Sequence, residues 1–168
     1  MKTPICTFDA KTGILCSMCE NKLDTGQISE SDVDGSIILT KLAQKNPDID
    51  KMTLISSKEI DDEIILIFKG SDVRTIRSNI KLFELIYKAF KKNIWIVESD
   101  SNDRRFLANL FYPIGIDNIN FIWLPDGHKL TRVVTDKKIN NVKEKTLESI
   151  KKISLSLRKI DLITETDM

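Results

Sequence analysis

The sequence predicts an α+β protein in which a short cysteine-rich segment precedes two units of α-β-β-α-β order. All three cysteines fall within residues 1–27, and helical and strand patterns alternate in the same order over about residues 29–99 and 102–164. With 41% hydrophobic and 30% charged residues, the 168-residue chain has enough apolar material for a core. We therefore divide it into segments 1–27, 28–100 and 101–165.

The first unit opens with a helix whose first turn carries a capping residue. Ser29 can accept a hydrogen bond from that turn, and Glu30 and Asp32 suit the positive end of the helix. Gly35 weakens this helix, and Asn46-Pro47 ends it. Its apolar face consists of Val33, Ile37, Ile38 and Leu42.

Two strands follow this helix. Residues 52–57 (MTLISS) favour a strand, and the continuous apolar run of residues 64–68 (IILIF) favours a buried one. The acidic segment 59–63 is expected to connect them. Its cluster Asp61-Asp62-Glu63 is interpreted as a solvated turn and not as a metal site, because adjacent strand residues point to opposite faces.

Helical spacing resumes at Asp72 and ends near Lys91 and Lys92, whose charges suit a helix C-terminus. Asn79 is expected to divide this stretch into a shorter and a longer helix. Residues 94–98 (IWIVE) then form the third strand.

The second unit repeats this order without evident sequence identity to the first. We expect a helix over residues 102–112, strands over 120–124 and 130–135, a helix over 142–158 and a short strand at 162–163. Pro125-Asp126-Gly127 predicts a turn between the two strands, and residues 165–168 are expected to fray. Trp95 and Trp123 lie in apolar strands, which favours core packing over the stacking of nucleobases.

Charge and hydropathy bound the possible environments and partners. The net charge is only +1, and it rises from −3 over residues 1–50 to +3 over residues 101–168, which a solvated surface explains as well as an RNA-binding face. No run of 18 apolar residues predicts a membrane span, and the N-terminus lacks the apolar core of a signal peptide. We therefore expect a cytoplasmic protein with reduced cysteines.

The densest chemical motif is Cys6-x2-Asp9-x6-Cys16-x2-Cys19. Zinc takes four ligands at tetrahedral angles, and a C-x2-C step brings two sulfurs of one tight turn to the same ion. Three thiolates and one carboxylate therefore predict a zinc site. The alternative is a decayed site whose cysteines only pack, whereas a redox role is disfavoured because no thioredoxin-like pattern surrounds the motif.

Three stretches, PICTFDAKTGILCSMCENKL, DVRTIRSNIKLFELIYKAFKKNIWIVE and NFIWLPDG, resemble archaeal KH-domain proteins that are similar to the transcription factor NusA. The resemblance implies two KH-like units behind a zinc knuckle, with RNA as a partner and no catalysis. It also implies a link to transcription elongation and termination or to ribosome-linked RNA processes. This chain departs from the family at Asp9, where the family has a cysteine, and at Arg77-Ser78-Asn79-Ile80, where the family has Gly-x-x-Gly.

The missing glycines exclude the usual close approach of the protein backbone to a nucleic acid, because Ile80 resists positive φ. Arg74, Arg77 and Lys81 could contact phosphates through their side chains instead, with Ser78 and Asn79 as hydrogen-bond donors. A second basic group comprises Lys88, Lys91 and Lys92, with Arg104 and Arg105 further along the chain. The alternative is that these are ordinary surface charges.

The sequence offers no combination of residues that predicts an enzyme. It contains neither a phosphate-binding glycine loop nor a nucleophile–base pair, and His128, the only histidine, lies in a turn. We therefore expect a non-catalytic RNA-binding protein without a small-molecule substrate, whose protein partner could be the ribosome or RNA polymerase. The competing hypothesis is a protein-interaction adaptor that keeps a KH-like scaffold and has lost RNA binding.

Overall fold

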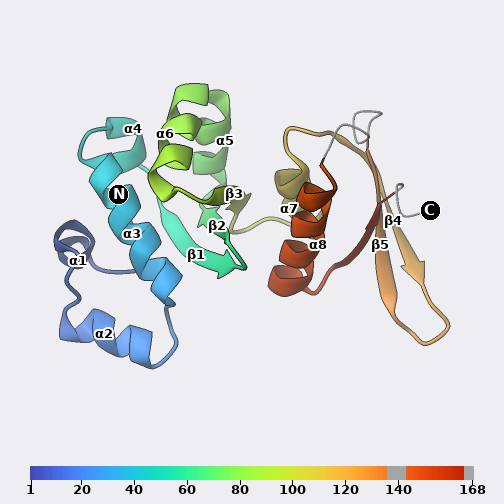
Figure 1. Cartoon of the computed structure of the whole chain (residues 1–168), viewed down its shortest axis with the longest axis horizontal. Coiled ribbons are helices and arrows are strands. Elements are labelled where there is room, and N and C mark those ends of the chain that lie inside the picture. The colour runs from blue at the N-terminus through green and yellow to red at the C-terminus, as the bar shows by residue number, and fades with distance from the viewer. Residues whose placement is uncertain (136–142, 165–168) are drawn as a thin grey trace. The chain divides into compact units, whose positions relative to one another are not determined.

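A computed structural model of the chain describes residues 1–135 and 143–164 and has the α+β architecture that the sequence predicts (Figure 1). The chain divides into two compact units, Met1–Asp100 (unit 1) and Ser101–Met168 (unit 2). Residue 142, the expected start of the last helix, and residues 165–168 lie outside the described residues. No helix of the described part is long and apolar enough to cross a membrane.

Unit 1 contains six helices and a three-stranded mixed sheet. β1 pairs antiparallel with β2, and β2 pairs parallel with β3. The two-helix connection α5–α6 joins the parallel strands. In chain order the elements are α1 (Thr7–Thr12), α2 (Ser17–Asp24), α3 (Glu30–Ala43), α4 (Pro47–Asp50), β1 (Leu54–Ile60), β2 (Glu63–Phe68), α5 (Gly70–Ser78), α6 (Ile80–Phe90) and β3 (Asn93–Glu98).

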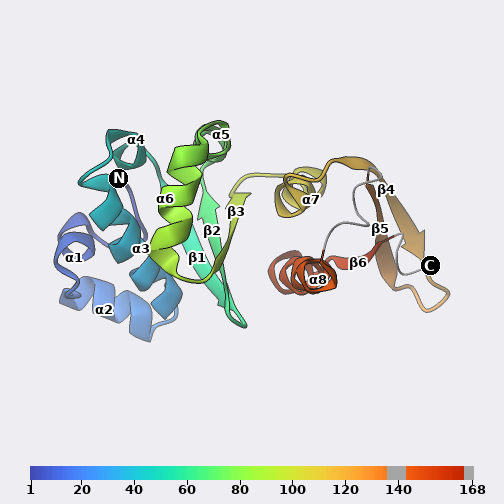
Figure 2. The ribbon, with the colours of Figure 1, turned by 45° about the horizontal axis from the view of Figure 1, so that its top comes forward.

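The core of unit 1 lies between this sheet and its helices. Alternate residues of β2, namely Ile64, Leu66 and Phe68, share one face of the strand and belong to the same buried cluster. Each fully buried aliphatic or aromatic side chain contributes roughly 1.5–3 kcal/mol. In Figure 2, α3 and α6 lie on the same side of the sheet. They contribute Leu39, Ala43, Leu82, Ile86 and Phe90 to the cluster.

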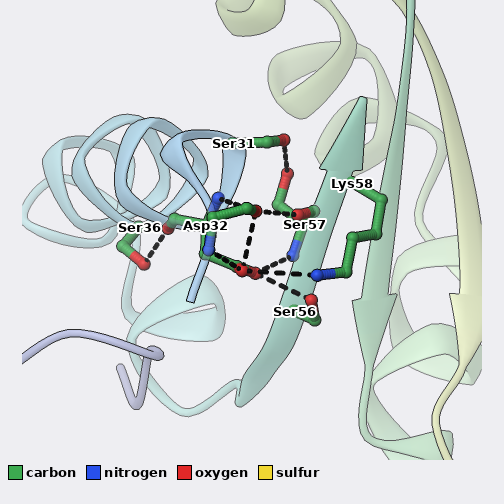
Figure 3. A network of polar contacts seen from close by, with 7 residues as sticks. Ser31, Asp32, Ser36, Ser56, Ser57 and Lys58 are labelled. Carbon is green, nitrogen blue, oxygen red and sulfur yellow. Dashed lines mark hydrogen bonds and ion pairs between the residues drawn. The ribbon is translucent and has the colours of Figure 1, made fainter. Parts of the chain in front are cut away.

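A polar network fixes α3 against β1 at the centre of unit 1 (Figure 3). Ser29 and Asp32 form a reciprocal capping box at the start of α3, as the sequence predicts for Ser29. Asp32 also accepts hydrogen bonds from the Ser57 backbone N–H at 2.6 Å and from Ser56 Oγ at 2.7 Å, both from β1. Gly35 allows this close approach, because a Cβ there would lie 2.9 Å from the Ser57 Cβ.

Asn79 separates α5 from α6, as expected from the sequence. It is the C-terminal cap of α5 and the N-terminal cap of α6, and its extended backbone breaks the helical path. Its side-chain oxygen accepts the Leu82 N–H at 3.2 Å. An asparagine is well suited to this position, because its short side chain supplies the acceptor that the next helix lacks.

Unit 2 has the predicted α-β-β-α-β order. Its elements are α7 (Asp103–Phe111), β4 (Ile116–Trp123), β5 (Lys129–Thr135), α8 (Glu144–Arg158) and β6 (Asp161–Thr164). β5 is the central strand, antiparallel to β4 and parallel to β6. α7 and α8 lie on one side of the sheet in Figures 1 and 2. Gly127, at φ +84°, lies in the predicted turn between β4 and β5.

Several predicted boundaries are wrong. Residues 59 and 60 are not part of the connection: β1 continues to Ile60 and β2 begins at Glu63, so Asp61 and Asp62 alone form the turn. Asp61 has φ +54°, a backbone conformation that aspartate tolerates better than most residues and that suits a two-residue hairpin. Pro47 follows the end of α3 and is itself in the first turn of the next helix, α4.

Two further corrections concern the site residues. Residues 1–27 contain two short helices, α1 and α2, where the sequence gives no sustained helical period. Trp123 is 68% exposed and does not pack in the core. Trp95 is half-buried, and its Nε1 donates to a Glu63 carboxylate oxygen.

Candidate metal centre and nucleic-acid interface

The four predicted metal ligands converge because each pair lies in the first turn of a short helix. Cys6 is the N-cap of α1 and Asp9 is its third residue, while Cys16 and Cys19 hold the same two positions in α2. The N-cap and the third helical residue lie side by side, which is the geometry that a capping box uses. The same spacing here places the two ligands of each helix next to each other. The four ligand atoms all lie within 4.8 Å of one another.

Backbone N–H groups point at the ligand atoms. The N–H of Cys6 donates to Cys19 Sγ at 3.4 Å, and that of Asp9 donates to Cys6 Sγ at 3.5 Å. The N–H of Cys16 donates to Asp9 Oδ2 at 2.9 Å. Such donors stabilise negative charge, so the local backbone is arranged for thiolates and a carboxylate.

Burial varies across the cluster. Asp9 and Cys19 are buried, Cys16 is half-buried and Cys6 is exposed. Cys19 packs in a small apolar cluster with Ile5 and Ala10. Partly buried residues that pack against this cluster include Ile28, Val33 and Ile37, from just before α3 and from α3 itself. The ligands are therefore attached to the main body of unit 1.

The electrostatics of the cluster differ from those of an ordinary core. The pKa of Asp9 is lowered to about 2, chiefly by the hydrogen bond from the Cys16 N–H and then by the neighbouring thiols. Burial raises the pKa of the Cys19 thiol to about 12, and the nearby Asp9 carboxylate adds to this rise. Asp9 Oδ1 is buried without a hydrogen-bond partner. A buried carboxylate with an unused oxygen beside three sulfurs is well placed to bind a cation.

The cluster can therefore hold a metal ion. Around a tetrahedral ion with metal–sulfur bonds of about 2.3 Å, ligand atoms lie roughly 3.8 Å apart. The observed limit of 4.8 Å is within reach of that arrangement through small side-chain rotations. Bound metal would also deprotonate the thiols, because a coordinated thiol exists as thiolate.

The predicted RNA-binding residues cluster around the break between α5 and α6. Arg74, Ser78 and Lys81 are exposed, as is Asn79, which supplies the cap described above. Arg77 is half-buried, and its guanidinium donates to the Ile96 carbonyl of β3 at 3.2 Å. Arg77 thus braces α5 against the sheet, whereas its neighbours in sequence project outward.

The three lysines of the second basic group, Lys88, Lys91 and Lys92, have different surroundings. Lys88 is exposed on α6, seven residues after Lys81 and therefore on the same face of the helix. Lys91 ends α6 in a left-handed conformation with φ +53°. Lys92 pairs with Glu59 at 2.5 Å, which raises the pKa of the lysine. Its charge is thereby partly neutralised.

Three groups of exposed apolar side chains were not predicted from the sequence. One follows a single face of α6 and consists of Ile80, Phe83 and Tyr87, at 73%, 37% and 43% exposure. A helical wheel would have revealed it, because these residues are spaced by three and four. The second group lies between the metal ligands in sequence and consists of Phe8, Ile14 and Met18. The third is the pair Phe121 and Trp123 on β4.

Comparisons with known proteins bear on the fold alone. No protein-family model matches the sequence, and no curated protein matches it. Among solved structures the chain is similar to a protein described as APE1850, with a TM-score of 0.52 and 19% sequence identity. The match covers 76% of this chain and 95% of that one. It shows that the architecture of this chain resembles that of APE1850.

Proposed function

We propose that this protein is a non-catalytic, cytoplasmic RNA-binding protein of KH type that acts in transcription elongation or termination or in ribosome-linked RNA processes. The observation that carries the proposal is the α5–α6 corner. Arg74, Ser78 and Lys81 project from it into solvent, at the position that matches the nucleic-acid-binding loop of the family the sequence resembles.

The chemistry of the corner favours contact through side chains. Ile80 is 73% exposed where the family has a glycine, so an RNA backbone cannot approach the protein backbone closely. Cationic side chains that reach outward can still neutralise phosphates at longer range. Binding of this kind is salt-dependent and reads little sequence, because phosphates are the same at every nucleotide.

We further propose that the ion held by the cysteine cluster is zinc and that its role is structural. Thiolates are soft ligands that suit zinc, and a buried carboxylate is an accepted fourth ligand. All four ligands come from the protein, as in closed structural sites. The ion would hold α1 to α2 and thereby fix the exposed residues Phe8, Ile14 and Met18 in one surface.

The RNA proposal is tested by filter binding of a single-stranded RNA at several salt concentrations. In the double variant Arg74→Ala/Lys81→Ala, we expect weaker retention and a log–log salt slope that shrinks by about one unit for each cation removed. Lys11→Ala, which removes an exposed lysine of α1, is the matched control and should leave the slope nearly unchanged. An unchanged slope in the double variant would contradict the role of the corner.

A second candidate function is a protein-interaction adaptor, and the exposed stripe Ile80, Phe83 and Tyr87 favours it. Exposed apolar residues aligned on one helix face are typical of surfaces that bind a partner helix or groove. A ribosomal protein or an RNA polymerase subunit would be the kind of partner expected. The filter-binding experiment separates the two functions, because the adaptor alone predicts no RNA retention even at low salt.

A further inference from the structure

Unit 2 contains a cavity whose lining residues belong to neither the metal cluster nor the α5–α6 corner. Its volume is about 260 Å³. It lies between the helices and the helix-covered face of the sheet, and its walls come from α7, β4, β5 and the C-terminal end of α8. The lining residues with aromatic or cationic side chains are Arg104, Phe121, Lys129, Arg158 and Lys159.

The cavity lies where one face of the β4–β5 hairpin changes from buried to exposed. Across the β4–β5 pair, Ile119 faces Val133, Phe121 faces Thr131 and Trp123 faces Lys129. Val133 is fully buried beneath the helices, whereas Phe121 and Trp123 are 53% and 68% exposed. The same face of the sheet thus passes from buried core to an open aromatic platform.

Positive charge surrounds this platform. Lys129 Nζ lies 3.9 Å from the centre of the Phe121 ring and 5.9 Å from that of Trp123. Arg104 and Lys159 are exposed at the rim. Arg158 is held within the fold, because it bonds Asp103 at 3.1 Å and lies over the Phe106 ring.

The charge balance of the rim favours an anionic ligand. Among the described residues that line the cavity, Asp103 is the one acid, and it is already paired with Arg158. Within the described residues, no carboxylate lies within ion-pair distance of Arg104, Lys129 or Lys159. In this part of the chain, three cations therefore face the cavity without a neutralising partner.

Aromatic faces next to unneutralised cations are the combination that binds single-stranded nucleic acid. Bases stack on the rings, and the cations contact the phosphates between them. A protein ligand is a poorer match, because apolar docking surfaces carry few charges at their centre. The volume is slightly below the roughly 300 Å³ at which pockets for drug-sized ligands begin, so the cavity suits about one nucleotide.

We infer that unit 2 binds a short single-stranded RNA segment, with one nucleotide in the cavity beside Phe121 and the next base stacked on Trp123. Lys129, Arg104 and Lys159 contact the phosphates. The inference deepens the proposed RNA-binding function and rests on it, but it uses a different set of residues. It also gives a role to Trp123, whose side chain is exposed and does not pack in the core.

The test uses the fluorescence of Trp123 in the full chain. The substitution Trp95→Phe leaves Trp123 as the only tryptophan, because the sequence contains two. Titration with a hexauridylate at low salt should quench the fluorescence in a saturable way, since a stacked base quenches an indole. An RNA hairpin with a long, fully paired stem should quench much less, and equal quenching by both would overturn the single-strand assignment.

Variants identify the groups that bind. In the Trp95→Phe background, Lys129→Ala and Arg104→Ala should each weaken the hexauridylate affinity by about tenfold and reduce the salt slope. Lys145→Ala removes an exposed lysine near the start of α8, 14 residues before Lys159, and should change the affinity less than twofold. Equal effects of all three would overturn the site. Circular dichroism of each variant shows whether the fold is intact.

The RNA-binding function and the unit 2 site fail in different ways. If RNA is retained on filters but Trp123 fluorescence does not change, the unit 2 site is wrong and the RNA-binding function stands. If quenching persists in Arg74→Ala/Lys81→Ala, the unit 2 site is supported independently of the corner. If neither retention nor quenching is seen, both proposals are overturned.

Discussion

Two buried carboxylates of unit 1, Asp9 and Asp32, are satisfied to very different degrees. They are 0% and 2% exposed, and each is the third residue of its helix. Asp32 has both oxygens occupied by protein donors, including two backbone N–H groups and two serine hydroxyls (Figure 3). Asp9 Oδ2 accepts one N–H, and its Oδ1 has no hydrogen-bond partner.

The difference separates a structural acid from a ligand. A buried charge is tolerated when donors surround it, and Asp32 meets that condition within the fold. A buried anion whose oxygen lacks a donor costs more free energy than a buried neutral group that lacks one. The thiols around Asp9 cannot remove that cost as fully as a cation can. The same residue type at the same helical position thus has two roles, set by its neighbours.

The largest effect is expected when Asp32 is removed. Asp32→Ala leaves the N–H groups of Ser29 and Ser57 and the Ser56 hydroxyl without their acceptor, so the free energy of unfolding should fall by about 3–5 kcal/mol. Urea denaturation followed by circular dichroism measures it. Asp34→Ala, which removes an exposed acid from the same helix, is the control and should cost less than about 0.5 kcal/mol. Similar losses in both would show that the network contributes little.

Removal of metal should give the next largest effect. With free zinc at a hundredfold excess over its dissociation constant, binding stabilises the folded chain by about 2.7 kcal/mol, and chelator should abolish that gain. Thermal unfolding with zinc and with chelator measures the difference. Cys19→Ser should lose most of this response, because a hydroxyl is a poor zinc ligand. A transition that is identical with and without zinc would refute the metal centre.

Local sequence signals predicted much of unit 1. Ser29 with Asp32 three residues later marks the start of α3, and Asn79 marks the break between α5 and α6. Both work because capping requires specific side chains at specific positions. The metal ligands follow from the sequence in the same way, because C-x2-C spacing in a reduced protein is typical of metal sites.

Non-local features could not be predicted. Gly35 looks like a weak point of a helix, and only the position of Ser57 on β1 shows why a side chain is excluded there. Trp123 looks like a core residue, because its strand is apolar. Its 68% exposure depends on which part of the sheet other elements cover, which the strand itself does not encode. The orphan oxygen of Asp9 likewise depends on which donors the fold brings near.

Replacing each acid by its amide should affect zinc binding in one case and not in the other. Asp9→Asn keeps the acceptor for the Cys16 N–H but removes a charged ligand, so zinc affinity should fall at least tenfold, or about 1.4 kcal/mol. Asp32→Asn should leave zinc affinity within about twofold, because its oxygens face α3 and β1 and not the cysteines. Competition against a colorimetric zinc chelator measures both. Equal losses of zinc affinity in both variants would contradict the assignment of Asp9, and not Asp32, as the metal ligand.

The smallest effect on stability is expected when the pH is lowered and Asp32 becomes protonated. Burial raises the pKa of Asp32, but the hydrogen bonds from Ser29, Ser57 and Ser56 outweigh it and hold the pKa below its ordinary value of 3.8. A depressed folded pKa means that the unfolded chain binds the proton first. The carboxylate therefore adds stability above about pH 4, and that contribution declines as pH falls toward the folded pKa.

Urea unfolding in chelator from pH 7 to pH 3 measures this contribution against Asp32→Asn. Asparagine does not titrate, so the stability gap between the two proteins should be constant near neutrality and should narrow once the pH falls below about 4. Chelator keeps the titration of the metal ligands equal in both proteins, so it cancels in the difference. A gap that widens in acid would show that the Asp32 carboxylate destabilises the folded chain, and the contrast with Asp9 would then be lost.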